Sequence, residues 1–167
     1  MNIEAQSTQS QSGFEDWESF KLGDTFKTEV EVECSDGLKA ILTGWSGEYV
    51  PPQIVSGSFS PEYGQRALQI STTTFQFYLR FGREITRFQM SYSGLIQRPS
   101  PTPPKTGFVA RFHGQGGNHA YDLLESQSSD VQTLNIVLPT PCTECLIGTF
   151  TVREPYYYFF IDNLRWS

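Results

Sequence analysis

The sequence contains few of the residues that build metal centres and nucleophilic active sites, with only two histidines and three cysteines among 167 residues. The cysteines, Cys34, Cys142 and Cys145, permit at most one internal disulfide and leave one thiol over. This is not the even, dense cysteine framework of a small secreted scaffold. A disulfide from Cys34 to either partner and three free thiols are both compatible with the pattern, and neither fixes the cellular compartment.

Positive charge is also scarce. Twelve Lys and Arg stand against eighteen Asp and Glu, which gives a formal net charge of −6 and a pI near 4.9. Attraction to nucleic acid or to anionic membranes requires clustered cations, so we predict no nucleic-acid partner. No run approaches the roughly 20 apolar residues that span a bilayer, so we predict no membrane insertion. The first residues lack the basic and apolar regions of a signal peptide.

The sequence shows no apolar period of 3.6 residues, which a helix would require. Apolar and polar residues alternate instead. Across residues 74–82, Phe and Leu side chains alternate with Gln76, Tyr78 and Arg80, which indicates a half-buried strand. Alternation recurs over 87–92, 107–113 and 133–138, and we expect further strands at 28–34, 67–72, 120–124, 148–153 and 156–166. Many short strands separated by turn residues predict an all-β fold, a two-sheet antiparallel β-sandwich of the jelly-roll type.

The length favours one domain, because a chain of this size supports a single continuous core. Residues 1–12 are rich in Gln and Ser and almost devoid of apolar side chains, so we predict a flexible tail. The domain is then expected over 13–167. Four prolines within 97–105 remove backbone donors and predict a loop there.

Three short motifs carry a family resemblance: Gly13-Phe-Glu-Asp-Trp17, Tyr63-Gly-Gln-Arg-Ala-Leu-Gln-Ile70 and Tyr158-Phe-Phe-Ile-Asp-Asn-Leu-Arg-Trp166. Taken together, they resemble the galactose-binding-like jelly roll, the fold of many carbohydrate-binding modules attached to glycoside hydrolases. The match spans nearly the whole predicted domain. The resemblance implies a saccharide or glycoconjugate as ligand, and it slightly favours an extracellular or cell-surface location.

The resemblance also implies a structural calcium ion. In such modules the first and last strands lie together, and each contributes a carboxylate to the ion beside backbone carbonyls. Matched position by position, Glu15 and Asp162 would be the carboxylates, with a carbonyl near Gln65 as a third contributor. Calcium takes roughly six to eight oxygen ligands and accepts such a mixed set. The alternative is that Glu15 is a surface charge and that Asp162 caps a turn or pairs with an arginine.

Side chains predicted to face away from the core form a candidate binding surface. They are Gln76, Tyr78, Arg80, Gln89, Ser91, Arg111 and His113. An aromatic ring, planar amides and guanidinium groups can stack on a sugar ring and bond its hydroxyls. The alternative is an ordinary solvated face. A rival location is a loop edge of the sandwich, where Trp45, Tyr49 and Tyr63 lie among glycines and prolines.

Other chemistries have weaker support. His113, His119, Cys142 and Cys145 could be taken as a zinc set, but they lack the tight second pair typical of structural zinc. Paired carboxylates on distant strands leave a small polysaccharide-acting sandwich enzyme as a third hypothesis. The second hypothesis is a protein-interaction or assembly module of a surface or particle structure. The leading hypothesis is a non-catalytic module that binds a saccharide by stacking and hydrogen bonds.

Overall fold

The computed structural model describes the backbone of residues 11–45, 50–58, 60–71, 74–96, 108–123, 130–149 and 157–167. Its strands are β1 Gly13–Glu15, β2 Val32–Glu33, β3 Lys39–Trp45, β4 Gln53–Ser56, β5 Arg66–Ser71, β6 Thr74–Ile96, β7 Phe108–Gly114, β8 Gly117–Leu123, β9 Gln132–Thr149 and β10 Tyr157–Trp166. The one helical element in these ranges is the 3-10 turn Ser35–Gly37, and no described helix has the length and apolar character needed to cross a membrane. All neighbouring strands pair antiparallel. The predicted all-β class is confirmed.

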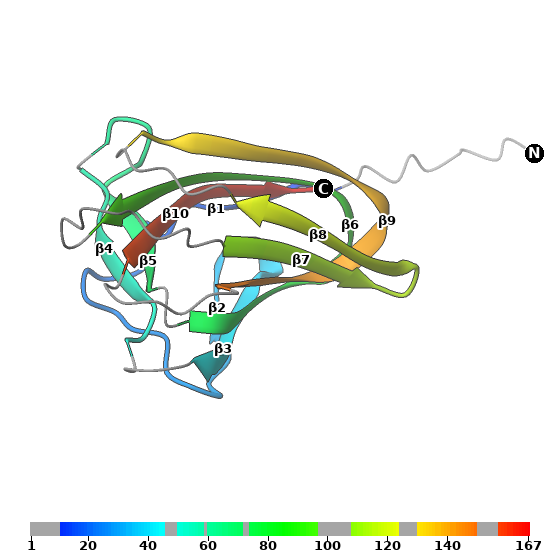
Figure 1. The fold of residues 1–167 in the computed structure, drawn as a ribbon, viewed down its shortest axis with the longest axis horizontal. Helices are drawn as coiled ribbons and strands as arrows, with labels where there is room; N and C mark the ends of the chain where they lie inside the picture. Colours follow the sequence, from blue (N-terminus) through cyan, green and yellow to red (C-terminus); the bar gives the residue numbers. More distant parts are fainter. Residues whose placement is uncertain are drawn as a thin grey trace, which may run out of the picture.

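Two long strands, β6 and β9, run through both layers and join them. The part of β6 before Gly82 pairs with β3, and the part after it pairs with β10. β9 accompanies β6 on both sides of this point. Sheet 1 therefore consists of β4, β5, β10, β6 and β9 with β1 against β10, and sheet 2 of β2, β3, β6, β9, β7 and β8. Figure 1 shows β6 and β9 curving round one end of the molecule from one layer into the other.

The bend between the layers follows from the sequence. Gly82 has φ +70, a left-handed conformation that glycine adopts without strain. The register between β6 and β9 shifts at the same place, between Arg80 and Ile85. On β9 the bend coincides with Pro139 and Pro141, which have no backbone N–H to donate. Segments 74–82 and 87–92 were expected as separate strands, and this expectation is wrong because the chain bends without leaving its ladder.

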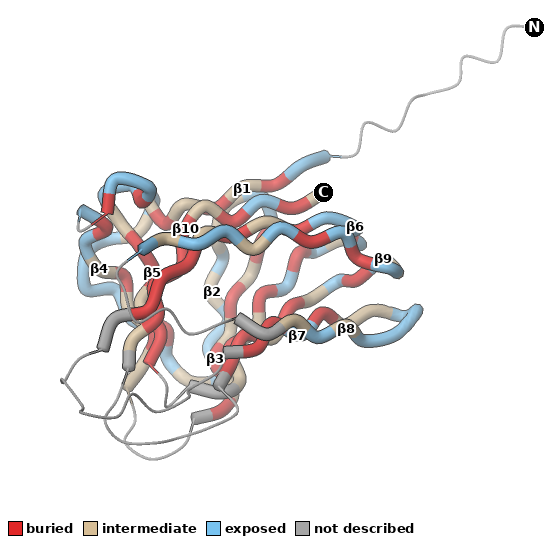
Figure 2. The backbone as a smooth tube through the Cα atoms, turned by 45° about the horizontal axis from the view of Figure 1, so that its top comes forward, coloured by how far each residue is buried: buried red, intermediate tan, exposed pale blue. Residues whose placement is uncertain are grey.

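Aromatic side chains fill the space between the sheets. Phe88 of sheet 1 and Phe112 of sheet 2 lie with their ring centroids 5.1 Å apart, and Phe81 and Trp166 with theirs 5.7 Å apart. All four side chains are buried. Figure 2 shows the alternation of buried and outward positions along the strands. The predicted inward set on 74–82 is confirmed where it is described, at Phe77, Leu79 and Phe81.

The first and last strands lie side by side, as the resemblance implies. Gly13 pairs with Trp166, and a Cβ added to Gly13 would lie 2.1 Å from Cε2 of the Trp166 indole. Only glycine leaves room for that ring. Beyond β1 the indole Nε1 of Trp17 donates to the carbonyl of Ile161 at 3.0 Å, which continues the contact with β10.

The expected strand at 28–34 is largely wrong. Only Val32–Glu33 forms a strand there, and Thr28 contributes an isolated bridge to Leu42. Glu29 has φ +59, which breaks an extended run. The predicted tail is described only at 11 and 12, and the proline-rich loop 97–105 lies outside the described residues.

Candidate functional site

The outer face of sheet 2 carries a row of side chains that includes two of the predicted site residues. The strand register aligns Ile41, Tyr78, Leu146, Arg111 and Ala120 across β3, β6, β9, β7 and β8. Side chains opposite each other in such a row are about 5 Å apart and interact. Tyr78 is half-buried between Ile41 and Leu146, whereas Arg111 is exposed. The row thus places an aromatic ring between two aliphatic side chains, with a guanidinium group beside them.

A second row beside the first is charged. It consists of Lys39, Arg80, Glu144, His113 and Asn118. Nη1 of Arg80 lies 3.2 Å from Oε2 of Glu31, and its Nε lies 3.5 Å from Oε2 of Glu144. Lys39 Nζ is 3.0 Å from Oε1 of Glu31, and the hydrogen bond from Lys39 lowers the pKa of Glu31. The positive charge of Arg80 is therefore matched by two carboxylates, and its guanidinium carbon lies 5.9 Å from the ring centroid of Tyr78.

Neighbouring side chains orient Gln76 and His113. The hydroxyl of Thr43 donates to Oε1 of Gln76 at 3.2 Å. His113 Nδ1 lies 3.0 Å from Oδ1 of Asn118, and its Nε2 is buried without a partner among the described residues. Groups held in place before a ligand arrives lose less entropy on binding. Gln76, Tyr78, Arg80, Arg111 and His113 therefore share one partly preorganised face.

Gln89 does not belong to this face. It pairs with Asn135 and Arg165 on the outer side of sheet 1, although it lies on the same strand as Gln76. The bend at Gly82 carries the two halves of β6 into opposite layers, so residues of one strand end up on different faces of the molecule. Ser91 follows Gln89 on sheet 1.

The rival loop site is only partly within the described structure. Tyr49 lies outside it, and Trp45 ends β3 with a side chain that is not described. Tyr63 is buried, and its hydroxyl is bonded to Ser93 Oγ at 2.7 Å and to the carbonyl of Phe160 at 3.0 Å. Burial raises the pKa of Tyr63 well above its usual range. This ring is a structural element and offers no stacking surface.

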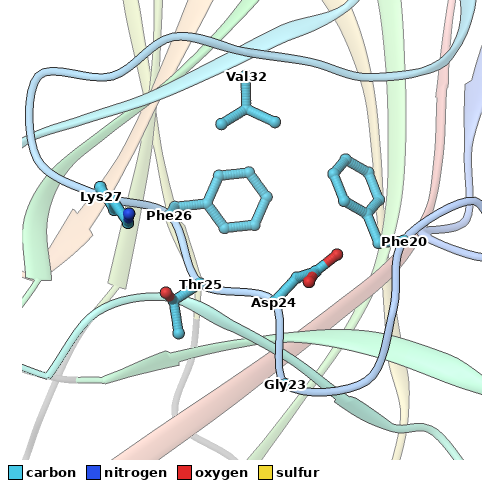
Figure 3. Close-up of a pocket in the computed structure, with 7 residues that line it drawn as sticks. All are labelled: Phe20, Gly23, Asp24, Thr25, Phe26, Lys27 and Val32. Carbon is cyan, nitrogen blue, oxygen red and sulfur yellow. The ribbon is translucent and has the colours of Figure 1, made fainter.

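Sequence reasoning missed a depression of about 330 Å³ at the segment between β1 and β2. Phe20, Gly23, Asp24, Thr25, Phe26, Lys27 and Val32 line it. Figure 3 shows the rings of Phe20 and Phe26 directed into one space, with Val32 on the side opposite Asp24 and Thr25. Phe26 is 1% exposed and packs edge-on against Phe77 at 5.4 Å, so its ring closes the core. Only the half-buried Phe20 presents aromatic surface here.

The two carboxylates expected to bind calcium lie on adjacent strands and are completely buried. Glu15 pairs with Leu164, two residues after Asp162. The carboxylate of Glu15 accepts the backbone N–H groups of Trp17 and Ser35, both at 2.6 Å. Asp162 accepts those of Gly64 at 3.0 Å and Asn163 at 2.7 Å. Glu15 is therefore not a surface charge, and Asp162 ties the segment before β5 to β10.

The carboxylate oxygens of Glu15 and Asp162 are ligands of the type that a hard cation prefers. Each carboxylate oxygen keeps a second lone pair beside its N–H contact, and calcium prefers oxygen ligands. The pKa of Asp162 is raised to about 6, mainly by burial and in smaller part by the carboxylates of Asp16 and Glu18, against the lowering effect of the N–H bonds from Gly64 and Asn163. The carbonyl of Gln65 accepts the N–H of Gly57 at 2.9 Å. The described residues contain no group of three or more His, Cys, Asp or Glu placed to hold a metal, so an ion here would need backbone carbonyls as well.

The three cysteines are free thiols. Burial raises the pKa of Cys34 to about 12, so this thiol is un-ionised at neutral pH. Nε2 of His119 lies 2.7 Å from the hydroxyl of Thr140. Within the described ranges these histidines and cysteines do not assemble into a metal site, which leaves the zinc hypothesis without support.

Comparison with known proteins finds similarity only at the level of solved structures. No protein-family model and no curated protein matches the sequence. Among solved structures, the module TmCBM61 in complex with β-1,4-galactotriose is 14% identical with a TM-score of 0.45, over 76% of this chain and 85% of its own. The family 11 carbohydrate-binding module from Clostridium thermocellum, in complex with a β-1,3-1,4-mixed-linked tetrasaccharide, is 13% identical with a TM-score of 0.44, over 94% and 96%. Both neighbours are carbohydrate-binding modules.

Proposed function

We propose that the outer face of sheet 2 binds a saccharide and leaves it chemically unchanged. The observation that carries the proposal is the cross-strand row in which Tyr78 stands between Ile41 and Leu146, with Arg111 next in line. An aromatic ring embedded in aliphatic side chains gives an apolar platform for the C–H face of a sugar. Arg111 and Gln76 supply donors for hydroxyl groups at either side of that platform.

The charge distribution favours a neutral saccharide. Arg80 is compensated by Glu31 and Glu144, so the row beside the platform presents pairs of charges instead of a single sign. Compensated side chains can still bond hydroxyls, but they do not attract an anion over a distance. This leaves Arg111 as the cation without an ion-pair partner on the described part of this face.

Truncation of Tyr78 tests the proposal. We expect Tyr78→Ala to weaken binding of neutral oligosaccharides, selected on a glycan array, by roughly 1–2 kcal/mol in isothermal titration. Tyr78→Phe keeps the ring and is the matched control, so it should retain most of the affinity. Equal loss in both variants would mean that the hydroxyl binds and the platform does not. Unchanged affinity in both variants would show that this face does not bind the saccharide.

We also propose that calcium stabilises the junction of β1 and β10 through Glu15 and Asp162. Two buried carboxylates on adjacent strands support this, because neither makes an ion pair with a described Lys or Arg. A bound cation would compensate charge that burial otherwise penalises. The ion would hold the first strand, the segment before β5 and the last strand together, and it takes no part in sugar contact.

A further inference from the structure

The outer face of sheet 1 carries a cross-strand row of its own, at the end where the described termini lie. The register aligns Phe14, Arg165, Gln89 and Asn135 across β1, β10, β6 and β9. Their sequence neighbours Phe88, Leu164, Trp166 and Ile136 are buried, so by alternation the row faces outward. Two planar amides, a guanidinium and an aromatic ring are thus placed side by side.

This row borders a depression of about 280 Å³. Arg87 adds a second guanidinium to its lining, two residues before Gln89 on the same face of β6. The backbone of Ser167 pairs with that of Arg87, which brings the end of β10 to the rim: Ser167 donates to the carbonyl of Arg87 at 3.1 Å and accepts its N–H at 3.0 Å. The depression is therefore built on the paired strands β1, β10, β6 and β9.

The two arginines of this depression resemble Arg111 and differ from Arg66 and Arg80, because they have no ion-pair partner among the described residues. Arg66 pairs with Glu18 at 2.9 Å, and Arg80 pairs with two carboxylates. Within the described part of the chain, neither Arg87 nor Arg165 forms an ion pair. In a chain of net charge −6, two arginines without an ion pair therefore line one hollow.

The guanidinium of Arg165 is also held in position. Its central carbon lies 4.5 Å from the ring centroid of Phe14, in cation–π contact. The carboxylate of Asp36 approaches this strand, but it accepts the backbone N–H of Phe14 at 2.9 Å. The stacked guanidinium keeps its N–H edge available for a ligand, and a planar fork of donors matches an oxyanion.

We propose that this depression is a second binding site, specific for an acidic saccharide that carries a carboxylate or sulfate group. Arg87 and Arg165 bind the anionic group, and the amides of Gln89 and Asn135 bond the hydroxyls of the same ring. The site does not rest on the proposed function of sheet 2, because it lies on the opposite sheet and shares no residue with it.

Titration of the full chain with trigalacturonate and with its methyl ester tests the carboxylate form of the ligand, and sulfated chondroitin disaccharide tests the sulfate form. We expect at least one acidic probe to bind and its neutral counterpart, the methyl ester or the unsulfated disaccharide, to bind at least about tenfold more weakly. Arg165→Gln and Arg87→Gln should each weaken the acidic probe at least about tenfold. Arg111→Gln on sheet 2 is the matched control and should leave this binding unchanged. Circular dichroism of each variant verifies that the sandwich is intact.

Three outcomes would overturn the proposal. Equal affinity for acidic and neutral probes would show that charge is not recognised, and loss of binding in Arg111→Gln alone would place the site on sheet 2. Inorganic sulfate that competes as tightly as the saccharides would show a simple anion site. Failure of Tyr78→Ala to affect neutral sugars would concern only the sheet 2 proposal, so the two failures are distinguishable.

Discussion

The two outer faces of the sandwich use similar residue types in different electrostatic settings. On sheet 2, Arg80 lies between Glu31 and Glu144, and the adjoining row has Tyr78 among aliphatic side chains. On sheet 1, Arg87 and Arg165 border one depression with no ion pair among the described residues. The presence of arginine on a strand therefore does not define what the face recognises. The ion-pair partners of the arginine decide this. A paired guanidinium contributes hydrogen-bond donors, whereas an unpaired one also contributes a positive electrostatic potential.

One core supports both faces, so a substitution that disrupts the core should destabilise both of them. Phe112, beneath sheet 2, packs against Phe88, beneath sheet 1, and is completely buried. Phe112→Ala should lower the free energy of unfolding by about 3–5 kcal/mol through lost transfer energy and a cavity. Val137→Ala, at a position 67% exposed on sheet 1, should change it by less than about 0.5 kcal/mol. Urea denaturation measures both, and equal effects would contradict the assignment of the core.

Protonation of Asp162 should change the free energy of unfolding of the whole sandwich. Burial raises its pKa from 3.8 to about 6, so the folded state holds this proton more tightly than the unfolded state does. Stability from this group is therefore complete below about pH 4 and is lost as the pH rises through about 6, by at most about 3 kcal/mol. Denaturation of wild type and Asp162→Asn across this range should show the slope only in wild type. Identical slopes would assign the effect to other groups.

Calcium should oppose that loss, because it compensates the ionised carboxylates. We expect millimolar calcium to raise the melting temperature at neutral pH and a chelator to lower it, through linkage to the folded state. In Glu15→Gln both effects should shrink. A melting temperature that changes with neither calcium nor chelator would show that no calcium ion stabilises this junction. Neither saccharide-site proposal would be affected.

Added salt should change the affinities of the two faces for their ligands differently, and we expect this effect to be smaller than those above. Binding of an acidic saccharide at Arg87 and Arg165 should weaken as sodium chloride is raised, because the unpaired charges are screened. Binding of a neutral saccharide at Tyr78 should change little over the same range. Titrations at low and high salt measure this, and an equal dependence would mean that the faces do not differ in charge as described.

Local pattern was enough to predict extended structure and an inward set over 74–82, because alternation at Phe77, Leu79 and Phe81 depends only on the pleat of one strand. It predicted no strand at Lys39–Trp45 or Gln53–Ser56. The same pattern assigned Gln76, Tyr78, Arg80, Arg111 and His113 to outward positions, where the structure places them at the surface or half-buried. The motif match also anticipated that Glu15 and Asp162 lie on adjacent strands.

The grouping of faces required the topology. Gln89 and Tyr78 are on one continuous strand, and only the bend at Gly82 places them in different sheets. Similarly, Phe14 and Arg165 come together with Gln89 and Asn135 only through long-range register. No local signal in the sequence encodes that juxtaposition, so the acidic-ligand depression was not predicted.

The most direct test of two separate faces is chemical-shift mapping by nuclear magnetic resonance during titration of the labelled full chain with a neutral oligosaccharide. We predict that the backbone amides with the largest chemical-shift changes lie at 76–80, 109–113 and 144–148 on sheet 2. The chemical shifts of the amides at 87–89, 135 and 165 on sheet 1 should not change. Changes concentrated on that second group, or absent from both groups, would show that the neutral saccharide does not bind to sheet 2.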